Sequence, residues 1–341
     1  MLATYLLIDV LIAYIIDLIA GDPYWLPHPV RFIGRFVKKC ESFLRRFTSK
    51  TSKENVARSE RIAGVILMIA VVSATFLIVF AILRIAGLLH TLLFHIINIY
   101  FIYTSLATKC LANEANKVYS ALAAGDLHEA RKCLSMLVGR QTEHLNHEEV
   151  ARGVIETTAE NTVDGIISPL IFAIAGSFFG LGAPFVYAFK AISTLDSMVG
   201  YMNEQYIHFG RASAKTDDVV NFLPARLSGI LIPMGAYICK FNFYKSFAIM
   251  VRDRRNHKSP NSAYPEAAFA GALGIKIGGT NVYFGQAVEK PAIGDADKEI
   301  SAEDIPKAIK LMYAASAITL IMGVGLAFVF LFFININKIN M

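Results

Sequence analysis

The chain has 341 residues, of which 55% are hydrophobic and only 18% are charged, and its formal net charge is +6. Soluble domains have about 45–50% apolar and about 25% charged residues. The composition therefore excludes intrinsic disorder, collagen and a disulfide scaffold, and it indicates an integral membrane protein. Most Lys and Arg residues lie between apolar runs, so membrane topology explains the positive charge and we expect no nucleic-acid partner.

Four apolar runs are long enough for a helix to cross a bilayer, which takes about 20 residues. They lie at 1–20, 62–83, 85–107 and 311–334. Only Arg84 separates the second run from the third, which predicts a helical hairpin or one long bent element. The first run contains Asp9 and Asp17, and an ionisable group inside a span is a functional candidate unless it lies near the interface.

Two further apolar stretches, 166–189 and 227–247, are interrupted by glycine or proline and either cross the membrane or re-enter. Residues 110–139 are amphipathic and predict a helix with a turn at Gly125 and Asp126. The sequence thus predicts an all-α, polytopic helical membrane protein. We expect about four to six membrane-embedded segments and cytoplasmic helical loops, within a single domain over 1–341.

The charge of the loops predicts their side of the membrane. Segment 31–61 carries ten Lys or Arg against three acids, which places it in the cytoplasm. It follows that 108–165 is cytoplasmic. Segment 240–310 holds eleven Lys or Arg, so its loop 248–310 should lie inside as well. Segment 190–226 is balanced, so it lies outside if both interrupted stretches cross and inside if both re-enter. We expect a multi-pass protein of the cell membrane.

One acidic stripe is a candidate metal site. Arg152, Glu156, Glu160 and Asp164 recur every four residues. On an α-helix each such step ends about 40° past a full turn, so these side chains share one drifting face. With Asn161, three carboxylates could hold Mg²⁺, which prefers oxygen ligands. The alternative is a solvated face with an Arg152–Glu156 ion pair.

Two more segments concentrate polar groups. Segment 190–226 mixes them with apolar residues, and 252–266 is rich in arginine, whose fork suits phosphate oxygens. A basic membrane anchor is the alternative interpretation of the second segment. The sequence contains no GxxxxGK[ST], GxGxxG, HExxH or GxSxG motif, which disfavours a P-loop ATPase, a zincin and an ordinary serine hydrolase.

Six blocks, in the same order, resemble the CobD/CbiB family of cobalamin biosynthesis. The resemblance runs from about residue 5 to about residue 310. The blocks are GDPYWLPHPVRFIG (21–34), ETTAENTVDGIISPL (156–170), YAFKAISTLDSMVGY (187–201), FGRASAKTDDVVNFLPARL (209–227), RDRRNHKSPNSAYPEAAFAGALG (252–274) and KPAIGD (290–295).

This resemblance implies an adenosylcobinamide-phosphate synthase, a ligase that depends on ATP and Mg²⁺. It joins a carboxylate of the corrinoid adenosylcobyric acid to the amine of aminopropanol phosphate. A carboxylate is a poor acyl donor, so we expect an acyl phosphate that the neutral amine attacks. That chemistry needs cations on the phosphoryl group and a base. Expected partners are the lipid bilayer and, as a further hypothesis, other cobalamin-pathway enzymes.

The clusters supply candidates for these roles. For catalysis we hypothesise Glu156, Glu160, Asp164, Lys190 and Asp196, and for the metal Glu160, Asp164 and Asp196. For substrate binding we hypothesise Asn161, Ser197, Asp217, Asp218, Arg226, Arg252, Arg254, His257, Lys258, Asn261 and Glu266. Because the substrates are expected in the cytoplasm, 190–226 is expected there too, with hairpin or re-entrant forms for both interrupted stretches.

Two alternatives belong to other classes. In a transporter, Asp9, Asp17 and the interrupted helix over 166–189 would line a pathway. A non-catalytic membrane sensor or scaffold of related fold would tolerate loss of the acidic stripe and the basic cluster, whereas the enzyme would not.

Overall fold

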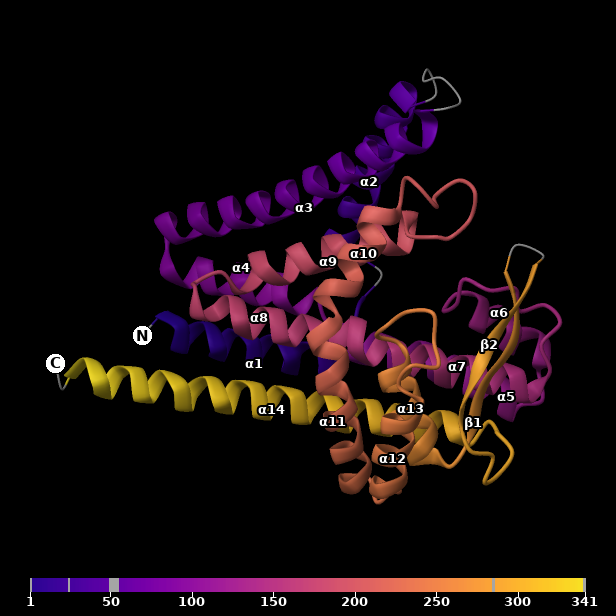
Figure 1. The fold of residues 1–341 in the computed structure, drawn as a ribbon. Helices are drawn as coiled ribbons and strands as arrows, with labels where there is room; N and C mark the ends of the chain where they lie inside the picture. Colours follow the sequence, from indigo (N-terminus) through magenta and orange to yellow (C-terminus); the bar gives the residue numbers. More distant parts are fainter. Residues whose placement is uncertain (1, 24, 49–54, 284–285, 340–341) are drawn as a thin grey trace. The chain divides into compact units, whose positions relative to one another are not determined.

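The computed structural model describes residues 2–23, 25–48, 55–283 and 286–339 (Figure 1). The parts of the predicted spans, loops and blocks that lie outside the described residues are Met1, Tyr24, 49–54 (which includes Lys50 and Lys53) and 284–285. The chain divides into two compact units. Unit 1 comprises Met1–Leu106, Pro169–Val220 and Gly323–Met341, and unit 2 comprises Ala107–Ser168 and Asn221–Met322.

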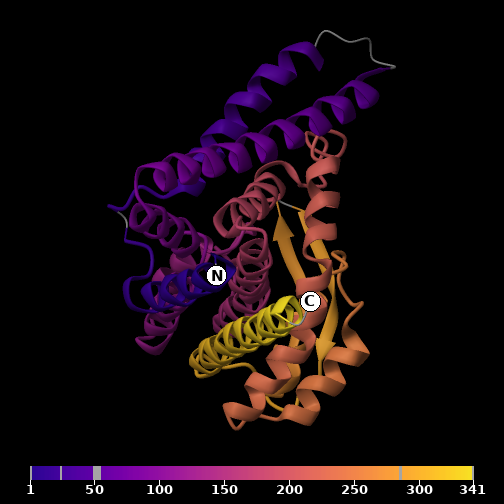
Figure 2. The same ribbon diagram turned by 90° about the vertical axis from the view of Figure 1, so that its left-hand side faces the viewer.

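Unit 1 is a bundle of helices. Its elements are α1 (Leu2–Ala20), α2 (Pro29–Thr48), α3 (Val56–Leu89), α4 (Thr91–Tyr103), α8 (Ser168–Phe178), α9 (Gly182–Val199), α10 (Arg211–Val220) and the C-terminal part of α14 (Asp304–Ile339). Helix α4 contacts α1, α3 and α9, and α2 packs along α3, as Figure 2 shows.

Several helices have the length and hydropathy of membrane spans. Among the described residues five segments qualify, and the α10–α11 pair, bent by 43°, would be a sixth. The five are Ala3–Ala20, Val56–Leu89, Thr91–Ala123, His147–Phe178 and Asp304–Ile334. The expected fold class, a polytopic and mainly helical membrane protein, is confirmed.

The predicted hairpin after the first loop exists, but the predicted break at Arg84 is wrong. Helix α3 continues through Arg84 to Leu89, and the chain reverses at His90, where φ is −164° and ψ is 136°. The His90 ring nitrogen Nδ1 accepts the N–H of Leu92 at 3.1 Å and so caps α4. Arginine is a good helix former, so Arg84 gives the helix no local reason to end.

The stretch 166–189 is not one element. Helix α8 ends at Phe178, α9 begins at Gly182, and the rings of Phe172 and Phe189 stack at 5.0 Å, so the two helices lie side by side. A Cβ on Gly176 would lie 2.6 Å from the carbonyl oxygen of Leu181, which explains the need for glycine there. The segment therefore forms a helical hairpin.

Asp9, one of the two acids in the first span, is buried and paired. Its Oδ2 lies 2.8 Å from Nδ1 of His95 and accepts the amide N–H of Asn98 at 2.8 Å. The Asn98 carbonyl oxygen accepts the backbone N–H of Ala183 at 3.3 Å. One polar cluster thus links α1, α4 and α9.

Replacing Asn98 with alanine should lower the stability of the protein by about 2–4 kcal/mol, because it leaves a buried carboxylate and a buried N–H short of a partner. Thermal unfolding of the detergent-purified protein measures the loss. Ile96→Ala, an exposed position on the same helix, is the control. Equal melting temperatures for the Asn98 variant and the wild type would contradict a structural role for the cluster.

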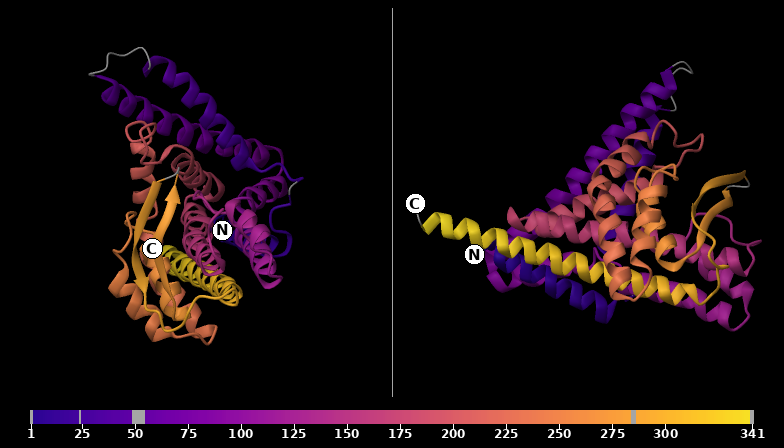
Figure 3. Two further views of the ribbon diagram at one scale, coloured as in Figure 1. Left: turned by 90° about the vertical axis from the view of Figure 1, so that its right-hand side faces the viewer. Right: turned by 60° about the horizontal axis from the view of Figure 1, so that its bottom comes forward.

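Unit 2 combines helices with a β-hairpin. It contains α5 (Thr108–Ala123), α6 (Leu127–Ser135), α7 (His147–Thr162), the π-helix η2 (Val163–Ile167), α11 (Phe222–Ile238), α12 (Phe243–Asp253), α13 (Ala263–Leu273), β1 (Lys276–Tyr283), β2 (Gln286–Gly294) and the N-terminal part of α14. The predicted helix with a turn at Gly125 is confirmed as α5 and α6, with Gly125 at φ 76°. Helix α13 is buried against α7, α11, α12 and both strands, which Figure 3 shows beside it.

The hairpin was not predicted from the sequence. Strands β1 and β2 pair antiparallel, with Ile277 opposite Ile293 and both side chains buried. A register shift follows Ile277, and Gly278 and Gly279 have φ values of 93° and 91°. Glycine pairs and an internal proline such as Pro291 are depleted in strands, which hid the element.

Candidate functional site

The hairpin is attached to α7 by a buried ionic network. Arg140 Nη1 lies 2.9 Å from Glu156 Oε2 and also donates to Oδ1 of Asn281 on β1. The other Glu156 oxygen accepts the backbone N–H of Gly278 at 3.0 Å. The Arg140 and Glu156 side chains are only 3% and 6% exposed. The network therefore fixes the backbone of β1 over the acidic face of α7.

Several polar atoms of this region are buried without a hydrogen-bond partner in the described structure. They are Nε and Nη2 of Arg140, Nε of Arg152, Nδ2 of Asn281 and Oε1 of Glu266. Buried polar groups in proteins are nearly always hydrogen-bonded, to protein or to ordered water. This concentration of unfilled donors and acceptors indicates room for a polar ligand or for water.

Glu266, on the first turn of α13, is a buried acid. It is 2% exposed, and the nearest cation is Lys290 Nζ, 4.0 Å from its Oε1. Burial raises the pKa of Glu266 to about 8; Lys290 opposes this rise, while Glu160 and Glu156 add to it. A carboxyl group with such a pKa can take up or release a proton near neutral pH.

Glu160 and His257 lie around the same acid. Glu160, half-buried on α7, accepts a hydrogen bond from the Ser262 hydroxyl at 3.0 Å. Burial and the charge of Lys290 lower the pKa of His257, with Glu160 and Glu156 opposing. Its Nδ1 accepts the backbone N–H of Ser259 at 3.0 Å.

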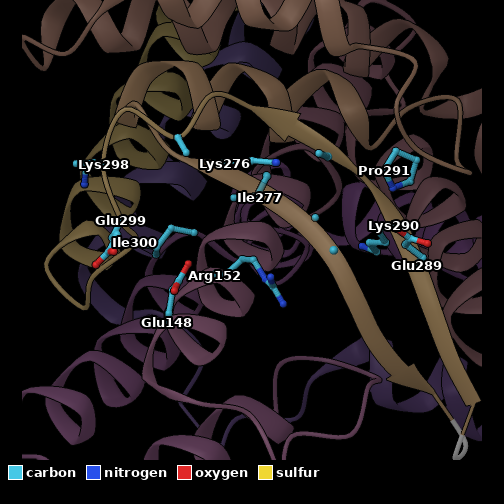
Figure 4. Close-up of a pocket in the computed structure, with 14 residues that line it drawn as sticks. Glu148, Arg152, Lys276, Ile277, Glu289, Lys290, Pro291, Lys298, Glu299 and Ile300 are labelled. Carbon is cyan, nitrogen blue, oxygen red and sulfur yellow. The ribbon is translucent and has the colours of Figure 1, made fainter.

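A pocket of about 830 Å³ opens beside β1. Its wall alternates cationic and acidic side chains with the backbone of Gly278 and Gly279 (Figure 4). The charged lining residues are Glu148 and Arg152 from α7, Lys276 from β1, Glu289 and Lys290 from β2, and Lys298 and Glu299 from the following segment. Because Gly278 and Lys290 also contact the buried carboxylates, the pocket and the acids share one wall.

The structure brings part of the predicted site together in unit 2. Arg226 donates to the side chain of Asn261 at 2.7 Å and lies over the Tyr264 ring at 4.7 Å. Asn161 donates to the Thr157 carbonyl at 2.9 Å.

The predicted phosphate-binding arginines of unit 2 are occupied by protein groups. Arg252 binds both oxygens of Asp253 at 2.8 Å and Asp295 at 2.9 Å, and these carboxylates raise its pKa. Arg254 donates to the Val251 carbonyl, and Lys258 is exposed.

Other predicted residues belong to unit 1. Lys190, Asp196 and Ser197 lie on α9, and Asp217 and Asp218 lie on α10, which contacts α9. Ser197 donates to the Ser193 carbonyl at 2.9 Å.

The regular stripe expected along α7 ends at Glu160. Asp164 lies in the π-helix η2, whose wider turn shifts the side chains that follow, so the α-helical spacing does not hold for Asp164. Among the described residues no three His, Cys, Asp or Glu side chains lie close enough to hold a metal ion. Of the residues expected at the metal, Glu160 and Asp164 lie in unit 2 and Asp196 lies in unit 1.

Sequence reasoning missed Arg140, Asn281 and the pocket lysines. Arg140 is 16 residues before its partner Glu156 and lies in no motif. Lys290 begins the block KPAIGD, so a signal for it was present. The ion pair expected for Arg152 and Glu156 is present only at 3.9 Å, because Arg140 holds the carboxylate more closely.

Arg140→Met should destabilise the protein by about 3–5 kcal/mol, because it leaves the Glu156 carboxylate buried without its close partner. The double variant Arg140→Met/Glu156→Gln should recover part of this loss, since no buried charge then remains unpaired. Lys132→Met, which breaks an exposed ion pair with Glu129, should cost less than about 1 kcal/mol. Melting temperatures of the wild type, Arg140→Met, Glu156→Gln, the double variant and the Lys132→Met control decide; strict additivity of the two single changes would contradict coupling between Arg140 and Glu156.

Comparison with known proteins identifies the family. The CobD/CbiB protein family model matches residues 10–312. The cobalamin biosynthesis protein CobD of Clostridium tetani is 49% identical over 317 residues, which is 92% of this chain and 96% of that protein. CobD of Citrobacter koseri is 46% identical and CbiB of Salmonella typhimurium 44%, each over 309 residues, 91% of this chain and 93% of the relative. No solved structure matches the chain significantly. The chain is therefore a multi-pass membrane member of the CobD/CbiB family of cobalamin biosynthesis proteins.

Proposed function

We propose that the protein is the adenosylcobinamide-phosphate synthase of the cell membrane. In this reaction ATP activates a carboxylate of adenosylcobyric acid as an acyl phosphate, and the amine of aminopropanol phosphate displaces phosphate to form the amide. The observation that carries the proposal, beyond family membership, is the site in unit 2. There a pocket lined by four cations and three acids shares Gly278 and Lys290 with the buried acids Glu156 and Glu266.

The pocket suits phosphorylated substrates. Its volume of about 830 Å³ lies in the range of about 300–1,000 Å³ typical of small-molecule sites. Arg152, Lys276, Lys290 and Lys298 supply positive charge for phosphate oxygens. Gly278 and Gly279 expose backbone at positive φ, and side chains there would crowd the Pro291 carbonyl and the Arg152 guanidinium.

The acids have separate tasks in this proposal. Glu266 has a pKa near 8, and in its ionised form it accepts the proton that the amine loses as it attacks. His257 is held neutral by burial and Lys290, so it adds no positive charge beside the incoming ammonium group. Glu156 keeps its structural ion pair with Arg140 and positions the Gly278 backbone.

The residues also fit the expected Mg²⁺. This ion is usually bound by one or two carboxylates together with substrate phosphates and water, so a three-carboxylate cluster is not required. Glu160, with one oxygen on the Ser262 hydroxyl, is the carboxylate we assign to it. When bound, Mg²⁺ supplies charge neutralisation on the transferring phosphoryl group.

Segment 190–226 should face the cytoplasm, since its block is expected to meet cytoplasmic substrates. Ser213 is fully buried and unsuitable for labelling, whereas Lys215 on α10 is exposed. In a variant whose native cysteines are replaced, Lys215→Cys should react with an impermeant thiol reagent in inside-out vesicles and stay unlabelled in intact cells. Labelling in intact cells would place the segment outside.

The proposal is tested with detergent-purified protein, adenosylcobyric acid, aminopropanol phosphate, ATP and Mg²⁺. The expected result is the amide product by mass spectrometry, formed only when ATP is present. Folded protein that binds the corrinoid but forms no product would reject the synthase in favour of a non-catalytic member of the family.

A further inference from the structure

Helix α2 carries three distinct faces. Ile33, Val37 and Thr48 are buried in unit 1. Phe32, Phe36, Phe43 and Phe47 are 56%, 38%, 57% and 60% exposed. With 100° between neighbouring residues, these four rings lie within about 60° of one another around the helix. The helix therefore carries a partly exposed phenylalanine stripe.

Positive charge lies directly beside this stripe. Arg31, Arg35, Lys38 and Lys39 are all exposed, and the first twelve residues of α2 contain no acid. By the same helical geometry, Arg35 and Lys39 are the closest of these four cations to the phenylalanine stripe, and the Arg35 guanidinium lies 5.5 Å from the Phe32 ring centroid. An amphipathic helix with Phe on one face and Lys and Arg next to it is typical of binding to anionic membrane surfaces.

An apolar pocket of about 480 Å³ begins under the same turn of α2. Phe32 and Phe36 form one wall, and Ile78 and Ile82 of α3 form another. Both lining tyrosine hydroxyls are already used, because Tyr100 donates to the Pro27 carbonyl at 2.6 Å and Tyr187 lies 2.7 Å from the Thr104 hydroxyl. The pocket therefore offers a ligand almost only hydrocarbon contact.

The position of the pocket beside a predicted span favours a lipid. Helix α1 ends at Ala20, and the connection to α2 is held to the end of α4 by Tyr100 and by Tyr103, which donates to the Gly21 carbonyl. The pocket thus lies close to the ends of two apolar helices, with exposed cations next to it. A soluble anion would match the cations but not the hydrocarbon wall.

We propose that α2 and this pocket form a binding site for an anionic phospholipid. The headgroup binds Arg35 and Lys39, and one acyl chain enters between α2 and α3. The site is independent of the reaction proposed above, since it lies entirely in unit 1.

The single tryptophan of the chain makes the test direct. Trp25 is 80% exposed and lies two residues before Pro27, which lines the pocket. The full-length protein is reconstituted in phosphatidylcholine vesicles that contain a small fraction of lipid brominated on the acyl chains. Brominated phosphatidylglycerol should quench Trp25 fluorescence several-fold more than the same fraction of brominated phosphatidylcholine.

Two pairs of variants show which residues cause the difference in quenching between the two lipids. Arg35→Gln/Lys39→Gln should bring the quenching ratio close to 1, while Lys117→Gln/Lys132→Gln, which removes two charges from exposed positions of unit 2, should leave it unchanged. Ile82→Phe should fill the pocket and weaken quenching by phosphatidylglycerol, and Ile85→Phe, an exposed position on the same helix, should not. Equal quenching by both lipids in the wild type, or an unchanged ratio in the Arg35/Lys39 variant, would overturn the proposal.

Discussion

Glu266→Gln is expected to raise the melting temperature of the protein and to abolish amide formation. Glu266 is buried, and its pKa rises from an ordinary value of 4.5 to about 8. The ionised Glu266 side chain therefore destabilises the folded state. Glutamine carries no charge and removes this destabilisation. A pKa difference of about 3.5 (8 minus 4.5) corresponds to at most about 5 kcal/mol, at about 1.4 kcal/mol per pKa unit. The buried glutamine amide also lacks a full set of hydrogen-bond partners, and this offsets part of the gain in stability.

The burial of Glu266 should make the stability of the folded protein depend on pH. Between about pH 4.5 and about pH 8 the unfolded chain has lost the Glu266 proton while the folded protein keeps it. The folded state then binds more protons, so its stability falls as pH rises through this window and levels off above it. The glutamine variant lacks this fall, and its advantage in melting temperature should grow from pH 5 to pH 8.

Glu143→Gln is the matched control for this pH series. Glu143 is exposed and outside the site, so its replacement should change neither the pH profile of stability nor the rate of product formation. A Glu266 variant that is less stable than the wild type at pH 8 would show that the carboxylate is ionised and well paired in the folded protein. A fully active Glu266 variant would remove this residue from the proposed chemistry.

The sequence predicted the membrane helices well because their signal is local. The runs around 62–83 and 311–334 are apolar over a full bilayer thickness, and helices occupy both. The helix break was misplaced because it depends on the His90 cap, a contact of one side chain with one backbone N–H. The hairpin β1–β2 was missed because its glycines and proline weaken the strand pattern, and packing on α13 compensates.

The candidate site likewise contains residues that the sequence predicted and residues that it did not. Glu156, Glu160 and Glu266 were selected from spacing and resemblance, and the structure brings them near one another in unit 2. Arg140 and Asn281 could not be found, because Arg140 meets Glu156 and Asn281 only through tertiary folding. The stripe also failed to extend to Asp164, because a π-helix interrupts the α-helical spacing.

Glu160→Gln should reduce product formation by at least about 100-fold while the protein still inserts and folds. The substitution keeps the size of the side chain and an acceptor for the Ser262 hydroxyl, so the fold loses little. It removes the negatively charged oxygen that we propose as the ligand of Mg²⁺, and a neutral amide is a poor ligand for a hard cation. Steady-state rates at several Mg²⁺ concentrations, together with the melting temperature, measure both effects.

Ser262→Ala separates the charge of Glu160 from its orientation. In this proposal Ser262 orients Glu160 by donating a hydrogen bond to it, so loss of the Ser262 hydroxyl should lower the rate by about 10-fold or less. High Mg²⁺ should restore part of the lost rate, because the Glu160 carboxylate itself remains. High Mg²⁺ should not rescue Glu160→Gln. Near-normal turnover in the Glu160 variant would exclude Glu160 as the metal ligand and move that role to another carboxylate of unit 2.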